Sequence, residues 1–378
     1  MQTATATILR PKFAKHRCFK SSNPTRNELK EAVVTVEKLK RHKDHGIVGL
    51  DITLLALKNT SSYMIGTWSN GFKVIEYDSE VYSGKLPVLG GSLNDIIYVE
   101  SLDCYLMYIE GRIYRKDIDS QPPFIFKELQ CGFRPGAVLK WSEINQRLIV
   151  IKGGKNVAVI DPYTKDVEIE IKDSLGGNVM DFRFVGEMED KVVTVTEDGY
   201  VNLFKLNYGQ KSATYVTHYK LDLLRERQEE GFSIAVCDRA KYLLVEIGDM
   251  KSGYCSRMIV LKINNGHLIK KASVDRFDQK LRSKLALECC GYIDQNILWV
   301  GFSMDSLGLA QIFEFDVADG ELRELEKKRV PHGENEVYKV SRVDNQYYYT
   351  GMHGRVMKLG FHVCLTNTSE CMEKCTLI

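Results

Sequence analysis

The chain has 378 residues and a mass of 43.1 kDa, which is more than one typical domain and suggests several domains or one large repetitive domain. Its hydrophobic fraction of 44% and charged fraction of 27% are typical of globular proteins and exclude a disordered or collagen-like chain. The formal net charge is only +2, so the overall charge gives no indication of nucleic-acid binding. No stretch reaches the roughly eighteen consecutive apolar residues that a membrane-spanning helix needs.

The N-terminal segment is basic. Residues 1–46 contain eleven Lys and Arg against four Asp and Glu, which leaves the rest of the chain mildly acidic. The first acid is Glu28, and Pro11 and Pro24 interrupt any long helix before it. We expect residues 1–32 to form a flexible basic arm. Import into an organelle through this segment, or contact with an acidic partner, are the alternatives.

Short strand-like runs alternate with turns after this arm. Residues 33–40 predict one isolated strand, and the chain beyond it divides into units with a period of about 40–48 residues, which matches four-stranded propeller blades. The units cover residues 47–90, 95–130, 136–174, 178–222, 232–275, 285–330 and 334–363. The last unit supplies only three strands. We therefore predict an all-β, seven-bladed β-propeller of four-stranded antiparallel blades at residues 33–363, closed when strand 33–40 becomes the outer strand of the last blade.

A recurring hairpin supports this repeat. Each example has a strand-like run, a tight turn with glycine where positive φ is needed, and a second run. The clearest examples are residues 63–78 with Asn70-Gly71, residues 191–206 with Asp198-Gly199, and residues 346–359 with His353-Gly354. No strand alternates with a long helix, so a parallel α/β sheet is disfavoured.

These hairpins resemble WD40 repeats, which combine an Asp-Gly turn with a strand that ends in an aromatic-Asp dipeptide. The residues that carry the resemblance are Asp198-Gly199 for the turn, Tyr77-Asp78 and Phe315-Asp316 for the dipeptide, Ile160-Asp161 for its usual continuation, and His332 for the opening of a repeat. Leu359-Gly360 and Phe204-Lys205 depart from the dipeptide, and no unit has the full Asp-His-Ser-Trp hydrogen-bond set. The resemblance covers residues 33–363 and implies a propeller without indicating a subfamily.

Long loops predict where such a propeller binds. In a WD40-like blade, the connections between blades and the turns between second and third strands open on one face, the top face. The long loops fall in the fifth and sixth units, and loops on a rigid scaffold are where recognition usually occurs. We predict a partner-binding sector formed by the cations Arg225, Arg227, Lys251, Arg276, Lys280, Arg282 and Lys284. The alternative is an ordinary solvated loop surface.

No enzyme motif accompanies the repeat. The sequence has no HExxH, GxSxG, Walker-type or GxGxxG motif, and His42 and His45 have the spacing of some metal ligands but no third ligand nearby. We predict no catalytic residue, metal or cofactor, and a non-catalytic scaffold that assembles a multiprotein complex; no small-molecule substrate or nucleic acid is expected. The alternative is a metal-dependent propeller hydrolase, with Asp181, Glu246 and Glu288 as candidates for a site in the central channel.

Residues 364–378 are expected to form a C-terminal tail. The chain ends in Cys375-Thr-Leu-Ile378, which loosely fits the prenylation pattern, so Cys375 is a possible lipidation site and the one route to a membrane. The ten cysteines show no CxxC spacing and no apolar secretory leader precedes them. A reducing compartment, the cytoplasm, is therefore the expected location.

Overall fold

The computed structural model describes residues 29–38, 54–59, 61–67, 71–77, 79–129, 139–152, 154, 156–172, 175–237, 241–249, 254–275, 285–293, 296–303, 309–324, 330–331, 337–343, 346–351 and 356–365. Within these residues the regular elements are β-strands, apart from two short 3-10 turns, η1 (Glu100–Leu102) and η2 (Arg225–Arg227). The prediction of an all-β fold is confirmed.

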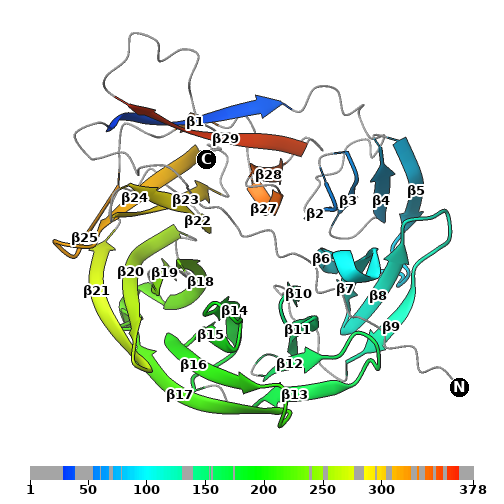
Figure 1. The fold of residues 1–378 in the computed structure, drawn as a ribbon, viewed down its shortest axis with the longest axis horizontal. Coiled ribbons are helices and arrows are strands. Elements are labelled where there is room, and N and C mark those ends of the chain that lie inside the picture. Colours follow the sequence, from blue (N-terminus) through cyan, green and yellow to red (C-terminus); the bar gives the residue numbers. More distant parts are fainter. Residues whose placement is uncertain are drawn as a thin grey trace, which may run out of the picture.

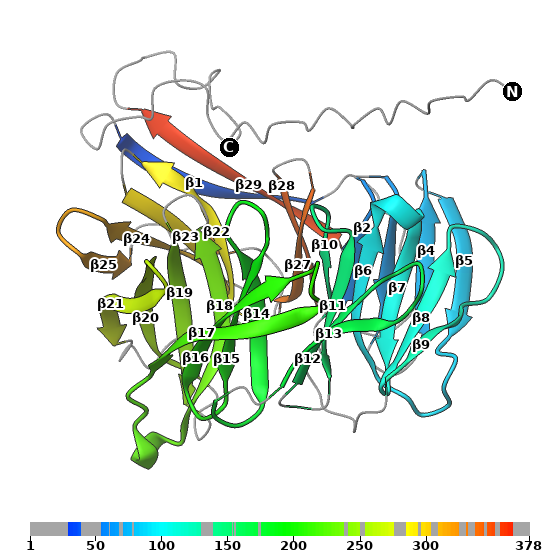
Figure 2. The same ribbon diagram turned by 60° about the horizontal axis from the view of Figure 1, so that its bottom comes forward.

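The described strands form antiparallel sheets that stand in a ring, with the first strand of each sheet nearest the centre (Figure 1). Figure 2 shows the same sheets obliquely. The first three are β2 (Leu54–Leu57), β3 (Tyr63–Gly66), β4 (Gly71–Glu76) and β5 (Ser79–Lys85); β6 (Leu93–Val99), β7 (Cys104–Ile109), β8 (Arg112–Asp117) and β9 (Phe124–Glu128); and β10 (Leu139–Ser142), β11 (Arg147–Lys152), β12 (Asn156–Ile160) and β13 (Val167–Ile171).

The next sheets continue in chain order. They are β14 (Val179–Val185), β15 (Lys191–Thr196), β16 (Tyr200–Asn207) and β17 (Ser212–Lys220); β18 (Glu229–Cys237), β19 (Tyr242–Asp249), β20 (Tyr254–Asn264) and β21 (His267–Asp275); and β22 (Leu285–Ile293), β23 (Asn296–Ser303), β24 (Leu309–Asp316) and β25 (Glu321–Glu324), with β26 (Val330–Pro331) paired to β24. The last sheet contains β27 (Val337–Val343), β28 (Gln346–Gly351) and β29 (Val356–Leu365).

The fourth strand of the last sheet is β1 (Leu29–Lys38), which runs antiparallel to β29. This strand was expected at residues 33–40 and begins four residues earlier. The reason is that β29 extends to Leu365, two residues beyond the expected last unit, and offers a partner to the residues from Leu29 onward.

The core lies between neighbouring sheets. In β15, Val193 and Val195 pack in the cluster shared with the fifth sheet, whereas Val192 packs in the cluster shared with the third. Both faces of the strand are thus buried, which explains why residues 191–196 form an almost continuous β-branched run. Such clusters lie on both sides of each of the second to fifth sheets. Each fully buried aliphatic side chain in them contributes about 1.5–3 kcal/mol.

The strand order gives the ring two distinct ends. Because neighbouring strands are antiparallel, the turns between first and second strands and between third and fourth strands lie at one end, the bottom face. The turns between second and third strands and the connections between sheets lie at the other end, the top face. The Asp198-Gly199 turn is at the top: Gly199 has φ +77°, and a Cβ atom there would come within 2.7 Å of Leu223.

Candidate interaction surface

The connection between the fourth and fifth sheets is the part of the predicted binding sector that the structure describes best. This segment, residues 221–228, is called the joining segment. It begins at buried Leu221, whose N–H donates to the carbonyl of Gly199 (2.8 Å). It then forms η2, and Gln228 ends the turn with φ +51° and an N–H bond to the carbonyl of Arg225 (3.1 Å). The segment is therefore hydrogen-bonded at both ends.

A buried ion pair holds the joining segment on the fifth sheet. The guanidinium of Arg257 donates to the carboxylate of Glu229 (2.5 Å), whose side chain is fully buried, and also to the carbonyl of Asp222. The same carboxylate accepts the N–H of Leu224 (2.7 Å). One charge pair thus fixes the backbone of the segment at two points, which gives the loop a defined shape without a helix or strand of its own.

The joining segment displays mixed charge. Arg225 is exposed, but so are its neighbours Asp222 and Glu226. Arg227 belongs to η2 through its backbone. Of the seven cations predicted for the sector, these two are therefore brought into one turn, beside two acids that the prediction did not weigh.

The other five predicted cations, Lys251, Arg276, Lys280, Arg282 and Lys284, lie outside the described residues. The strands that lead to them end beside the joining segment. In the strand register, Asp249 lies opposite Glu229 on β18 and opposite Tyr254 on β20, and Asp275 lies opposite Arg257. In the sequence, Arg276 comes directly after Asp275, and Lys251 comes two residues after Asp249. His42, His45 and Cys375 also lie outside the described residues.

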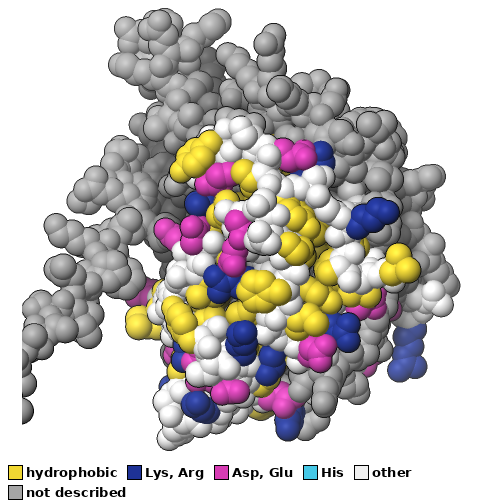
Figure 3. Space-filling view, turned by 90° about the vertical axis from the view of Figure 1, so that its right-hand side faces the viewer, with side chains coloured by type: hydrophobic (Ala, Val, Ile, Leu, Met, Phe, Trp, Pro, Cys, Tyr) yellow, Lys and Arg dark blue, Asp and Glu magenta, His cyan; other side chains and the backbone are white. Residues whose placement is uncertain are grey.

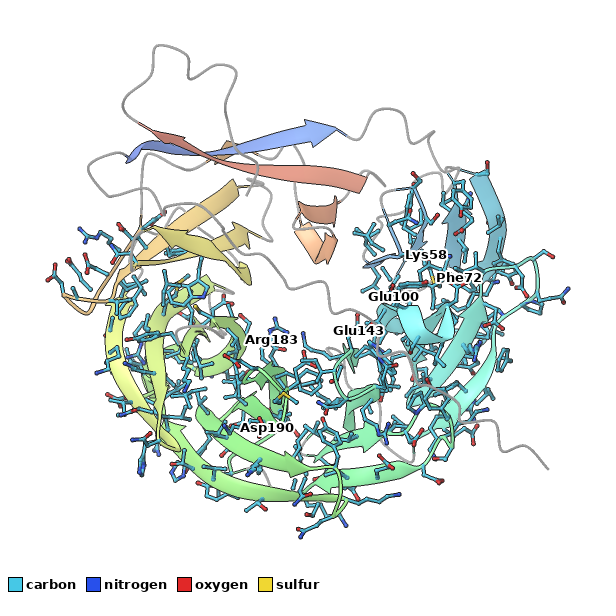
Figure 4. The ribbon with its side chains drawn as sticks, viewed as in Figure 1. Lys58, Phe72, Glu100, Glu143, Arg183 and Asp190 are labelled. Atoms are coloured by element: carbon cyan, nitrogen blue, oxygen red, sulfur yellow. The ribbon has the colours of Figure 1, made fainter. Side chains whose placement is uncertain are left out.

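The channel acids considered for a metal are engaged in hydrogen bonds of the fold. Asp181 on β14 accepts the N–H of Phe182 (2.8 Å) and a bond from Arg183 (3.1 Å; labelled in Figure 4), and its second oxygen accepts the N–H of Ile234 on β18 (3.1 Å). It therefore joins the fourth sheet to the fifth. Glu246 is fully buried and accepts the hydroxyl of Ser233 (2.7 Å).

Asp95 repeats the arrangement of Asp181 in the second sheet. Its carboxylate accepts the N–H of Ile96 (2.9 Å) and the N–H of Leu139 in the third sheet (2.8 Å). The sequence did not lead us to predict these hydrogen bonds between neighbouring sheets. The available signal was an aspartate at the same place in two first strands, Asn94-Asp95 and Met180-Asp181, each at a break in strand register.

Glu288 belongs to β22, but its side chain lies outside the described part of the structure. Among the described side chains, no three His, Cys, Asp or Glu residues gather closely enough to hold a metal ion. In the same part of the chain, no helix is long and apolar enough to cross a membrane.

The rim has apolar side chains of its own. Figure 3 views the side of the ring formed by the first and second sheets and shows hydrophobic side chains scattered among charged ones. Phe124 and Ile125 on the outer strand β9 are exposed, and so is Leu89 in the connection between the first and second sheets.

Comparison with known proteins identifies the fold. No protein-family model matches the sequence, and no curated protein matches it. The chain is similar to the WD40 β-propeller domain of Doa1, with a TM-score of 0.53 and 12% identity over 90% of this chain and 97% of that one. It is also similar to a protein from Lactobacillus plantarum, with a TM-score of 0.58 and 14% identity over 80% of this chain and 97% of that one.

A third similar structure is Raptor from Chaetomium thermophilum, with a TM-score of 0.56 and 12% identity over 92% of this chain and 29% of that one. At these identities the likeness shows the fold alone. The chain is a β-propeller. Its fold is similar to that of the WD40 β-propeller domain of Doa1, so the resemblance predicted from the hairpins is confirmed for the fold.

Proposed function

We propose that the protein is a non-catalytic scaffold that binds other proteins through its top-face loops, centred on the joining segment. The observation that carries this proposal is the buried Arg257–Glu229 pair. A buried ion pair is costly to desolvate and adds little net stability, so its use to fix an exposed loop favours a role for the shape of that loop. WD40 propellers among the similar structures support a protein partner.

We also propose the number of blades and the way in which the ring closes. Each sheet is one blade of a seven-bladed ring that runs from Leu29 to Leu365, and β1 closes the ring as the outer strand of the last blade. The pairing of β1 with β29 along Leu29–Lys38 supports closure, as does the contact of β2 with both β6 and β27. A closed ring leaves no open sheet edge between the first and last blades.

The experiment is affinity purification with mass spectrometry from the native cell. The test variant reverses Arg227, Lys280 and Arg282 to Glu. Cations on a binding surface accelerate association with acidic partners, and substitutions outside a core change stability by only about 0.5 kcal/mol, so we expect the variant to stay folded but capture less of its top-face partner.

The matched control reverses three lysines that lie away from the joining segment, Lys165, Lys205 and Lys270, all of which are exposed. Both variants change the net charge by the same amount. Selective loss of a partner from the test variant supports the proposal. Equal partner lists for wild type, control and test variant would show that partners use the rim or the bottom face.

A further inference from the structure

The bottom face has a cluster of acids around the central opening. It consists of the turns between first and second strands of the second, third and fourth sheets, residues 100–103, 143–146 and 187–190, here called the acidic turn surface. Glu100, Glu143 and Glu187 are exposed and make no ion pair with any described residue. Figure 4 labels Glu100 and Glu143 at the inner edge of the ring. None of the three turns contains a Lys or Arg.

Two cations contact this surface. Lys58 is paired with Asp103 (3.0 Å), and the guanidinium of Arg147 donates to the carbonyl of Gln146 (3.0 Å). Both Arg147 and Lys211 are paired with Glu168 (2.5 and 3.1 Å). Lys191 and Lys205 lie in the strands of the fourth sheet rather than in its inner turn. Glu100, Glu143 and Glu187 therefore keep an excess of negative charge on the inner turns.

Exposed apolar side chains lie among these acids. Ile144 is 40% exposed and Met188 is 64% exposed. Their turns are joined, because the amide of Asn145 donates to the carbonyl of Met188 (3.0 Å), and the hydroxyl of Ser142 donates to the carboxylate of Glu189 (2.5 Å). The two apolar side chains thus belong to one rigid surface bordered by carboxylates, which suits a ligand that is both basic and apolar.

The chain itself has a basic and partly apolar segment, which precedes β1 at the same face of the ring. Leu29, the first residue of β1, pairs with Leu365 at the end of β29, which is the bottom end of the last sheet. Residues 8–17 of the preceding segment contain Arg10, Lys12, Lys15 and Arg17 together with Ile8, Leu9 and Phe13, and no acid. Residues 366–378 leave from the same end but contain two Glu and one Lys, so they lack this complementarity.

We propose that the acidic turn surface binds residues 8–17 of the same chain. The last sheet lies across the ring from the third and fourth sheets (Figure 1). The stretch between Arg17 and Leu29 spans up to about 40 Å when extended. A compact chain of this length has a radius of gyration of about 21 Å, so the segment can cross the bottom face. This interaction uses the face opposite the proposed partner site and does not depend on it.

The test is a binding titration. A fluorescent peptide of residues 1–27 is added to protein lacking residues 1–27, and fluorescence anisotropy is measured at low and high salt. The peptide should bind the truncated protein, bind the full chain at least threefold more weakly because its own segment competes, and lose affinity as salt rises. Glu143→Gln with Glu187→Gln should weaken binding about tenfold, because each substitution removes a favourable interaction between one carboxylate and the basic peptide.

The matched control removes two exposed acids from the top face outside the joining segment, Asp198→Asn with Glu128→Gln, and should leave the affinity unchanged. Met188→Ala in a third protein should weaken binding without changing its salt dependence. Absence of binding, binding that salt does not affect, or an equal loss in the top-face control would overturn the proposal. A full chain that dimerises through this segment would overturn its intramolecular form.

Discussion

The buried pair between Arg257 and Glu229 gives the sharpest stability prediction. In Arg257→Met, the side chain keeps most of its length but loses its charge. The carboxylate of Glu229, which is fully buried, then retains the N–H of Leu224 but loses the guanidinium. Breaking a buried ion pair by removing one partner costs about 3–5 kcal/mol, because the remaining charge stays buried without its counter-ion. We expect a loss of stability in that range.

Chemical denaturation of wild type, Arg257→Met, Glu229→Gln and the double variant measures this loss as a double-mutant cycle. The double variant should recover most of the stability, since neither charge remains. Amide exchange should accelerate in residues 221–228 of the single variants before it does in β15 or β19, because the pair anchors that segment. A change below about 1 kcal/mol in Arg257→Met would refute the reasoning, since exposed pairs rarely contribute more.

Three further predictions follow from other contacts. Asp181→Ala should cost about 1–3 kcal/mol in thermal or chemical denaturation, because it leaves buried N–H donors of two sheets unsatisfied, and Asp181→Asn should cost less. Burial raises the pKa of Glu189 although the hydroxyl of Ser142 opposes the shift, so the stability that this residue contributes falls as pH rises above about 4. Glu189→Gln should therefore melt above wild type at pH 7 and lose that advantage near pH 4. Deletion of residues 1–40 should cause aggregation, whereas deletion of residues 1–27 should not change the melting temperature; a monomeric, equally stable 1–40 deletion would contradict the assignment of β1 as a closing strand.

Local sequence signals were sufficient for the strands and most turns. The fourth sheet covers Val179–Lys220, within the unit expected at residues 178–222, and the Asp198-Gly199 turn has the positive φ that the glycine indicated. Alternation and turn residues are properties of neighbours in the chain, so they can be recognised from one sequence. The wrong boundary at β1 arose because strand length is set by a partner more than 300 residues away.

The contacts that shape the candidate site have no local signal. Glu229 and Arg257 are 28 residues apart on two strands, and each resembles an ordinary charged strand residue. The seven predicted cations were chosen by charge and loop length, which identify exposed positions but not the acids beside them. Asp222 and Glu226 follow from the same sequence, yet their effect on Arg225 depends on the shape of η2, which the buried pair determines.

The missing family motif has a structural substitute in the fourth sheet. No unit has the full Asp-His-Ser-Trp set, but the amide of Asn202 on β16 donates to the carbonyl of Leu175 (3.1 Å), in the connection from the third sheet, and to Thr194 on β15 (3.4 Å). Thr194 and Asn202 are fully buried. A backbone carbonyl thus accepts the bond that ties the connection to the sheet. Because any residue supplies such a carbonyl, the connection can diverge in sequence while the link remains, and a search for conserved side chains cannot detect it.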